Sequence, residues 1–347
     1  MPDRAIRRLR VDEARALWEV EDVFSLGKKA HAARLALHPE PVVTYIVDRN
    51  INYTNVCACG CRFCAFFKAP GQPGGYVLAP QELAAKVAET VELGGYQILL
   101  QGGMHPDLHL DFYTGMLSTL RAGFPGVAVH GFSPPEIVFL AKMEGLSIAE
   151  VLTELKASGL ASLPGGGAEI LSDPIRSHVS PNKCPADEWI EVMATAHALG
   201  LRSTATMVIG LGETIEHRLE HLSRLRDLQD KTGGFTAFIP WTFQPGNTAL
   251  RVPEASSWEY LRMLALSRLF LDNIPNIQAS WVTQGPMVGQ MALYFGANDF
   301  GSTMIEENVV AAAGVRFSME EDELRRLVVK AGFEPVRRNM DYSRREA

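Results

Sequence analysis

The spacing of hydrophobic and polar residues along this 347-residue chain changes several times, and each change predicts a new element. Apolar residues recur at helical spacing over residues 11–37 without an internal proline, which predicts a helix that ends at Pro39 and Pro41. A β-branched apolar run over residues 42–47 then predicts a strand. We therefore expect a helical extension at residues 1–41 to precede the first strand.

Beyond this strand, short apolar runs alternate with amphipathic segments. Helices are predicted around residues 80–93, 111–123, 147–158, 186–199, 214–231 and 256–272. Further strands are predicted near residues 97–101, 127–132, 162–163, 203–209, 235–240, 276–281 and 293–295. Eight strands with intervening helices indicate an α/β protein with a parallel sheet and favour a (β/α)8 TIM-type barrel, closed or partial, over residues 42–310. Residues 311–347 are predicted to form a C-terminal helical tail with a loose end.

Composition and charge exclude several classes of protein. Hydrophobic residues make up 47% and charged residues 21%, which is enough for one large barrel or two medium domains. A net charge of -7 argues against a nucleic-acid partner. No uncharged apolar stretch reaches about 18 residues, so we expect no membrane span. The N-terminus lacks the apolar core of a secretory signal, and we expect a cytoplasmic location.

Three cysteines after the first predicted strand, Cys57, Cys61 and Cys64, carry the clearest chemical signal. Three thiolates at Cys-x3-Cys-x2-Cys spacing can hold three irons of a [4Fe–4S] cube. The fourth iron then lacks a protein ligand and is open for chemistry. Reacting groups of a TIM-type barrel lie on loops at the C-terminal ends of its strands, where this loop is predicted to fall.

Clustered cysteines have two other common uses. Structural zinc takes four ligands, and Cys59 offers a fourth sulfur, but four sulfurs in eight residues would crowd one tetrahedral ion. A disulfide is disfavoured in a reducing compartment. We therefore interpret Cys57, Cys61 and Cys64 as metal ligands, Cys59 as a bystander and Cys184 as an ordinary small apolar residue.

The cysteine spacing resembles that of the radical S-adenosylmethionine (SAM) enzymes. In that superfamily SAM binds the open iron, and one electron from the cluster splits it into methionine and a 5'-deoxyadenosyl radical. The resemblance therefore implies a [4Fe–4S] cluster and SAM as cofactors, with a low-potential electron donor protein as partner. Four segments resemble the menaquinone and deazaflavin branch of the superfamily: residues 52–57, 131–136, 164–169 and 238–248. Residues 52–57 and 238–248 most resemble the futalosine cyclases of that branch. The similarity extends over residues 43–308.

This resemblance implies an enzyme of menaquinone biosynthesis that acts on dehypoxanthine futalosine, whose ribose-derived end and benzoate end are joined through a ketone. In the family the radical abstracts the hydrogen from the sugar carbon C4', and the carbon radical adds to the aromatic ring. Loss of an electron and a proton then restores aromaticity. The alternatives are an aminofutalosine synthase or a related deazaflavin-type enzyme and, from another class, a non-catalytic zinc-binding scaffold.

Several predicted strand ends resemble the SAM-binding positions of the superfamily. Gln101, Gly102 and Gly103 resemble the segment that contacts the methionine amino group, although a plain βα turn would have the same sequence. Glu169, after three glycines, could accept hydrogen bonds from the ribose; its other interpretation is a helix N-terminal acid. Phe63 stands where an aromatic residue packs near the adenine, or it is a buried loop aromatic.

The segment after the fifth predicted strand, with Gly210 and Glu213, loosely resembles the one that backs the adenine, and Glu213 alternatively caps the next helix. A base for the last proton is also needed, and Asp299 is the first candidate. Glu136 is a second candidate unless it only occupies a helix's first turn, and His130 is a third because an imidazole titrates near pH 6.5. Further polar candidates for substrate contacts are Gln244, Asn247, Gln284 and Asn298.

Overall fold

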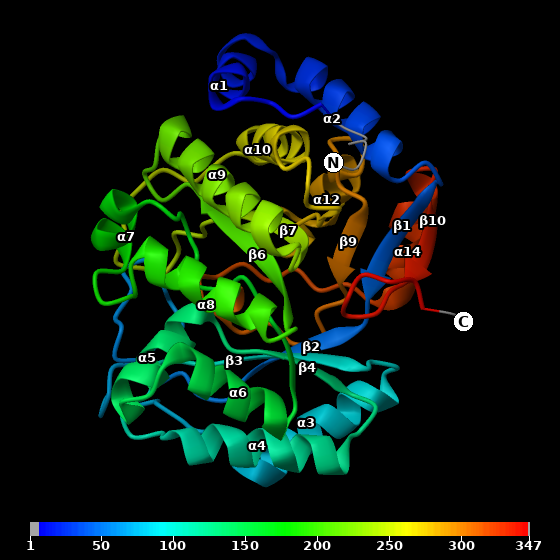
Figure 1. The fold of residues 1–347 in the computed structure, drawn as a ribbon. Helices are drawn as coiled ribbons and strands as arrows, with labels where there is room; N and C mark the ends of the chain where they lie inside the picture. Colours follow the sequence, from blue (N-terminus) through cyan, green and yellow to red (C-terminus); the bar gives the residue numbers. More distant parts are fainter. Residues whose placement is uncertain (1–6, 346–347) are drawn as a thin grey trace.

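A seven-stranded parallel sheet lies at the centre of the computed structural model, which describes residues 7–345 (Figure 1). Its strands follow one another in chain order: β2 (Asp48–Asn52), β3 (Gln97–Gln101), β4 (Ala128–Gly131), β5 (Leu160–Leu163), β6 (Arg202–Ile209), β7 (Phe235–Thr242) and β8 (Asn276–Ile277). The sheet curls into a half-barrel, so the predicted α/β class with a partial TIM-type barrel is confirmed. Within residues 7–345, no helix is both long and apolar enough to span a membrane.

Helices connect the strands and cover the outside of the sheet (Figure 1). They are α3 (Pro80–Glu92), α4 (Leu110–Gly123), α5 (Pro134–Glu144), α6 (Ile148–Ser158), α7 (Asp173–Val179), α8 (Ala186–Ala198), α9 (Ile215–Thr232) and α10 (Ser257–Phe270). Ser147 begins α6 through a capping box with Glu150, and left-handed Gly145 and Gly233 end α5 and α9. The unpredicted helix α5 is buried along most of its length, and it therefore lacks an amphipathic period.

The predicted N-terminal helix is two helices, α1 (Val11–Val20) and α2 (Val23–Leu37). The break falls at Asp22, whose carboxylate accepts hydrogen bonds from the backbone N–H groups of Phe24 and Ser25 and so begins a new helix. Helix α2 packs against α10 on the outside of the sheet. The prediction of one continuous helix was wrong because the side-chain cap interrupts the helix without breaking the apolar spacing.

Three predicted strands also need correction. Residues 42–47 do not form a barrel strand; β1 (Val42–Ile46) belongs to a separate parallel sheet of order β10-β1-β9, with β9 (Asp299–Ser302) and β10 (Glu334–Arg337). The first barrel strand is β2, whose mostly polar sequence lacks an apolar pattern. Residues 293–295 form no strand, because they lie in the turns after α12 (Pro286–Ala292). The strand predicted at residues 276–281 is cut short by α11 (Trp281–Gln284).

Residues 298–306 connect the two edges of the curled sheet through the backbone. The N–H of Asn298 donates to the carbonyl of Ile277 in β8, at 3.1 Å. At the other edge, the N–H of Ile305 donates to the carbonyl of Asp48 in β2, also at 3.1 Å. This segment therefore bridges the two edge strands, β8 and β2, of the curled sheet.

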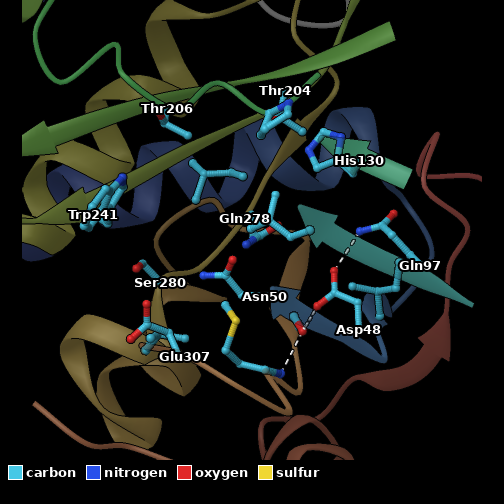
Figure 2. A pocket seen from close by; sticks show the side chains of 18 of the residues that line it. Asp48, Asn50, Gln97, His130, Thr204, Thr206, Trp241, Gln278, Ser280 and Glu307 are labelled. Carbon is cyan, nitrogen blue, oxygen red and sulfur yellow. Dashed lines mark hydrogen bonds between the residues drawn. The ribbon is translucent and has the colours of Figure 1, made fainter. Parts of the chain in front are cut away.

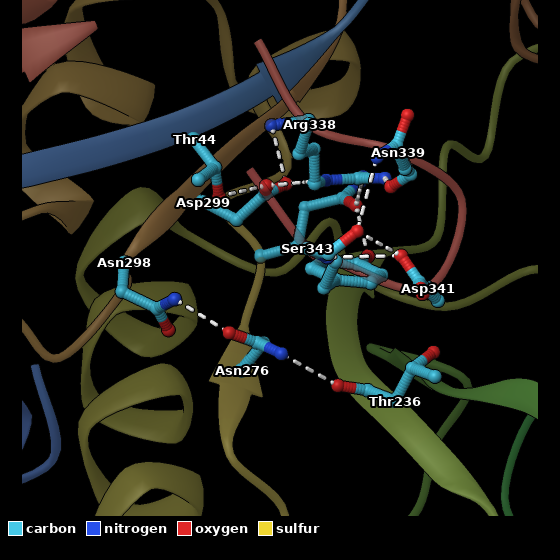
Figure 3. Close-up of polar contacts among 12 residues, drawn as sticks. Thr44, Thr236, Asn276, Asn298, Asp299, Arg338, Asn339, Asp341 and Ser343 are labelled. Atoms are coloured by element: carbon cyan, nitrogen blue, oxygen red, sulfur yellow. Dashed lines mark hydrogen bonds and ion pairs between the residues drawn. The ribbon is translucent and has the colours of Figure 1, made fainter. Parts of the chain in front are cut away.

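The C-terminal segment is more ordered than the predicted helix and loose end. After α13 (Val309–Ala312) it forms α14 (Glu321–Lys330) and then β10, which pairs with β1. Arg338 then reaches back to β9, where its Nε lies 2.6 Å from the Asp299 carboxylate (Figure 3). Thr44 donates a 2.6 Å hydrogen bond to the same carboxylate. Removing one partner of so buried an ion pair costs about 3–5 kcal/mol, so this pair fixes the C-terminal segment to the sheet.

Candidate active site

The cysteine loop, residues 57–64, follows β2 and lies against the end of β3. The N–H of Ala58 donates to the carbonyl of Met104 at 2.9 Å, and the N–H of Gly103 donates to the carbonyl of Thr54 at 3.1 Å. A Cβ on Gly103 would lie 2.1 Å from the carbonyl oxygen of Val56. Only glycine permits this approach, so Gly103 lies directly against the backbone at the start of the cysteine loop.

The thiols of the loop share one small apolar cluster, whose members are Cys57, Cys59, Cys61, Phe63, Cys64, Met104 and Phe139. All of these cysteines are free, and the sulfurs of Cys59 and Cys61 are 3.3 Å apart. Among residues 7–345, no three His, Cys, Asp or Glu side chains converge as in a formed metal site. The donor chemistry nevertheless fits an iron–sulfur cluster, because thiolates in a largely dry pocket are soft ligands that suit it.

Lys183 places a partly buried positive charge beside these thiols. Its Nζ lies 4.9 Å from the ring centre of Phe63 and 2.7 Å from a carboxylate oxygen of Glu169. The hydrogen bond from Cys59 lowers the pKa of Cys61, and the Lys183 charge lowers it further against the effect of burial. Burial raises the pKa of Cys57. Lys183 was not predicted, because a lysine in a proline-rich loop gives no local sign of burial.

Glu169 has a buried carboxylate with one oxygen available. The residue follows three glycines, has a φ of 41° and is 4% exposed. Its Oε1 is held by Lys183, whereas its Oε2 is 3.6 Å from Arg176 and has no hydrogen-bond partner among the described residues. A buried acceptor without a donor is destabilising, so this oxygen is suited to accept a hydrogen bond from a ligand.

Glu213 has a different environment from Glu169. Its carboxylate accepts hydrogen bonds from the N–H groups of Gly210, at 2.9 Å, and Leu211, at 2.7 Å. Arg218 donates to it at 2.7 Å. These contacts hold the turn before α9 and satisfy the carboxylate, which agrees with the alternative that Glu213 stabilises the start of that helix.

A cavity of about 250 Å³, called the barrel cavity below, lies inside the curled sheet (Figure 2). Because side chains alternate across a strand, every second residue of several strands faces it: Asp48 and Asn50 of β2, Gln97, Leu99 and Gln101 of β3, Thr204 and Thr206 of β6, and Ile239 and Trp241 of β7. From Gln97 to Gln101 it extends roughly 13 Å along β3. Gln101 lies two residues before Gly103, so one end of the cavity adjoins the cysteine loop.

The walls of the barrel cavity differ in polarity. Strands β2 and β3 contribute carboxyl and amide groups, as Figure 2 shows for Asp48, Asn50 and Gln97. Apolar side chains line much of the remaining wall, including Ile239, Trp241, Trp281, Val282, Met304, Val309 and Val310. Such a cavity suits a ligand that has both a polar and an aromatic part.

The three predicted acid–base residues do not lie together. His130 lines the barrel cavity, whereas Glu136 and Asp299 do not. Glu136 accepts hydrogen bonds from the hydroxyl of Tyr53, at 2.6 Å, and from the N–H of Ser133, at 2.7 Å, in the capping box of α5. Burial raises the pKa of Glu136. Asp299 is fully buried against Arg338, so both carboxylates have protein partners.

His130 is held by one side-chain partner in the wall of the cavity. Its Nδ1 is hydrogen-bonded to the hydroxyl of Ser162, and that hydroxyl also lies 2.8 Å from the sulfur of Met340. Burial, together with the charge of Arg338, lowers the pKa of His130 to about 3. The imidazole is therefore neutral at pH 7.

Asp48, Asn50 and Gln97 line the cavity but were not predicted as site residues. Nε2 of Gln97 donates to Asp48 at 2.7 Å, and burial raises the pKa of Asp48. The alternation of polar residues immediately before the cysteine loop was the available signal, because a polar face on a barrel strand must point to an enclosed interior.

A thiol-rich loop at the carboxyl ends of a curled parallel sheet, next to an enclosed cavity, defines a TIM-type enzyme with a candidate metal cofactor. Residues 51–225 match the model of the radical SAM superfamily, and residues 232–347 match the CofH/MqnC C-terminal region. The chain belongs to the radical SAM superfamily. Membership implies SAM and a [4Fe–4S] cluster as cofactors, which agrees with the donor chemistry of the cysteine loop.

Relatives of known name agree with this assignment. The chain is 47% identical to the cyclic dehypoxanthine futalosine synthase of Halalkalibacterium halodurans, over 98% of this chain and 93% of that protein. It is 43% identical to the protein of the same name from Streptomyces coelicolor, over 96% and 85%. A 5-amino-6-(D-ribitylamino)uracil–L-tyrosine 4-hydroxyphenyl transferase of Methanopyrus kandleri is 40% identical, over 96% and 93%.

Solved structures show the same fold at lower identity. Methylornithine synthase (PylB) superposes with a TM-score of 0.72 at 17% identity, covering 95% of each chain. The FeFe-hydrogenase maturase HydG from Carboxydothermus hydrogenoformans superposes with a TM-score of 0.73 at 15% identity, covering 97% of this chain and 78% of that one. These likenesses support the architecture alone.

We predict that His130 makes folding stability fall in acid. Its folded pKa of about 3 lies below the unfolded value of about 6.5, so the unfolded chain binds a proton that the folded chain does not. Stability attributable to this group therefore decreases as pH falls from about 6.5 toward 3. Between pH 7 and pH 5 the loss should be about 2 kcal/mol, and His130→Gln should remove it.

Urea denaturation at the two pH values measures this effect. Ser162→Ala is the matched control, because it removes the hydrogen bond of His130 but leaves the imidazole buried, and it should keep the pH dependence. An unchanged pH dependence in His130→Gln would show that His130 is accessible to protons in the folded protein.

Proposed function

We propose that this enzyme cyclises dehypoxanthine futalosine to cyclic dehypoxanthine futalosine in menaquinone biosynthesis. The observation that carries the proposal is the 47% identity, over 98% of this chain, to a cyclic dehypoxanthine futalosine synthase. Identity to the 4-hydroxyphenyl transferase of Methanopyrus kandleri is lower, at 40%. The barrel cavity supports the proposal, because its polar wall suits the sugar and its apolar wall suits the benzoate ring.

We propose that Cys57, Cys61 and Cys64 bind the cluster and that SAM occupies the space between them and the barrel cavity. When bound, these cofactors supply a 5'-deoxyadenosyl radical. The protein contributes position and exclusion of water: Gly103 holds the cysteine loop against β3, and Phe63 packs among the thiols. In this assignment Cys59 is a buried neighbour that stays protonated and donates to Cys61, because its hydrogen bond to Cys61 raises the pKa of Cys59.

Substitution of single cysteines tests this ligand set. Changing Cys57, Cys61 or Cys64 to Ala should remove the cluster, because three protein thiolates are the minimum for a cube with one open iron. Cys59→Ala should retain it and serves as the matched control. Iron and sulfide content after anaerobic reconstitution, with the visible charge-transfer absorption, measures the outcome. Loss of iron in Cys59→Ala would mean that the ligand set is different.

We also propose that the free carboxylate oxygen of Glu169 accepts a hydrogen bond from the ribose of SAM. Glu169→Gln should weaken SAM binding by about tenfold or more, since hydrogen bonds to charged groups are the stronger ones. Binding of the futalosine substrate should change little, because Glu169 does not line the barrel cavity. Equilibrium dialysis with each ligand gives the two affinities. Equal losses for both would instead indicate a structural role.

His130 is the proposed base for the final proton. The substrate loses one hydrogen atom to the 5'-deoxyadenosyl radical, and the second leaves as a proton and an electron. Of the three candidates only His130 lines the cavity, and its neutral imidazole would accept the proton. The cluster, when bound, would supply the one-electron acceptor that the balance requires. In this proposal Asp299 and Glu136 have structural roles. Asp299 binds Arg338, and Glu136 stabilises the start of α5.

An anaerobic assay tests the reaction itself. The reconstituted enzyme is given SAM, a strong chemical reductant in place of the electron donor protein, and dehypoxanthine futalosine, and the products are followed by mass spectrometry. We expect one 5'-deoxyadenosine for each product molecule, with a product two hydrogens lighter than the substrate. Deoxyadenosine without that product would retain the superfamily chemistry and exclude this substrate. A product that keeps the adenosyl carbon would indicate an aminofutalosine synthase-type reaction.

A further inference from the structure

Asn50 faces the barrel cavity from β2, and no residue among 7–345 hydrogen-bonds to its side chain. The residue is 6% exposed and sits in the middle of β2. Figure 2 shows its amide pointing into the cavity, between Gln278 and Ser280. An amide that is more than nine-tenths buried and unpartnered costs stability, so its presence here calls for a ligand.

Several neighbouring polar side chains have at least one partner in the protein. Asp48 lies two residues before Asn50 on the same face of β2 and accepts a hydrogen bond from Nε2 of Gln97, whose Oε1 has no partner among the described residues. The carbonyl oxygen of the Gln278 side chain accepts from the hydroxyl of Tyr342 at 2.9 Å. The complete lack of a side-chain partner therefore distinguishes Asn50 from Asp48, Gln97 and Gln278.

We propose that the Asn50 amide binds two adjacent hydroxyl groups of the substrate's sugar, and this inference rests on the proposed function. A side-chain amide has an acceptor oxygen and a donor NH2 side by side. Adjacent hydroxyls present a matching donor and acceptor, so one amide can bind both. This contact would hold the sugar on the polar wall of the cavity, with the benzoate ring directed toward the apolar wall near Trp241.

Asn50→Ala should bind dehypoxanthine futalosine about tenfold more weakly, through loss of two ordinary hydrogen bonds. Its thermal midpoint should not fall, because the amide has no protein partner to lose. Asn276→Ala is the matched control: its amide donates to the carbonyl of Thr236 and accepts from Asn298, outside the cavity (Figure 3). That variant should lower the thermal midpoint and leave the affinity unchanged.

The measurements are calorimetric titration of the reconstituted holoenzyme with SAM present and no reductant, and thermal unfolding of each variant. Analogues of the substrate that lack one sugar hydroxyl identify the contact. An analogue that lacks one of the two bound hydroxyls should bind the wild type more weakly than the full substrate does. The same analogue and the full substrate should bind Asn50→Ala with equal affinity.

Three results would overturn the assignment. Equal substrate affinity in the wild type and Asn50→Ala overturns the role of Asn50 alone, as does a fall in the thermal midpoint as large as that of Asn276→Ala. Failure of the wild type to bind the substrate overturns the proposed function and this inference with it.

Discussion

Polar side chains that point into the curled sheet must find partners there, and this constraint determines much of the structure. Transfer of an unpaired polar group from water to an apolar environment costs about 2–7 kcal/mol, and transfer of an unpaired charge costs more. Asp48 is therefore matched with Gln97, His130 with Ser162, and Arg338 with Asp299. The C-terminal segment supplies Arg338 for one of these pairs, and its Met340 contacts the hydroxyl of Ser162 in another. It is thus part of the interior and not an appendage.

Strand β3 joins the interior to the cysteine loop. Its last residue, Gln101, faces the barrel cavity, and Gly103, two residues later, contacts the loop so closely that a side chain would collide with it. The short covalent path between them sets the spacing between the thiols and the cavity. A cofactor held by the loop would therefore adjoin the cavity at the end next to β3.

The sequence predicted those features that depend on local pattern. Apolar periodicity identified most strands and helices, and the cysteine spacing identified the loop. Strand β2 was missed because its inward face carries Asp48, Asn50 and Asn52, so it has no apolar alternation. The apolar residues 293–295 have a composition typical of a strand, but they lie in the turns that follow α12. Lys183 and Met340 were missed because their partners are distant in the sequence, and tertiary contact leaves no local signal.

The same constraint separates residues that looked equivalent in the sequence. Asp299, Glu136 and His130 were all polar residues at predicted strand ends, but the first two have carboxylates bound by neighbouring donors. A group whose polar atoms are all held by the protein stabilises the fold and has little left with which to bind a ligand. The amide oxygen of Asn50 and one carboxylate oxygen of Glu169 are different, because both are buried and no described residue hydrogen-bonds to them. A fold tolerates such groups at the expense of stability where function needs them.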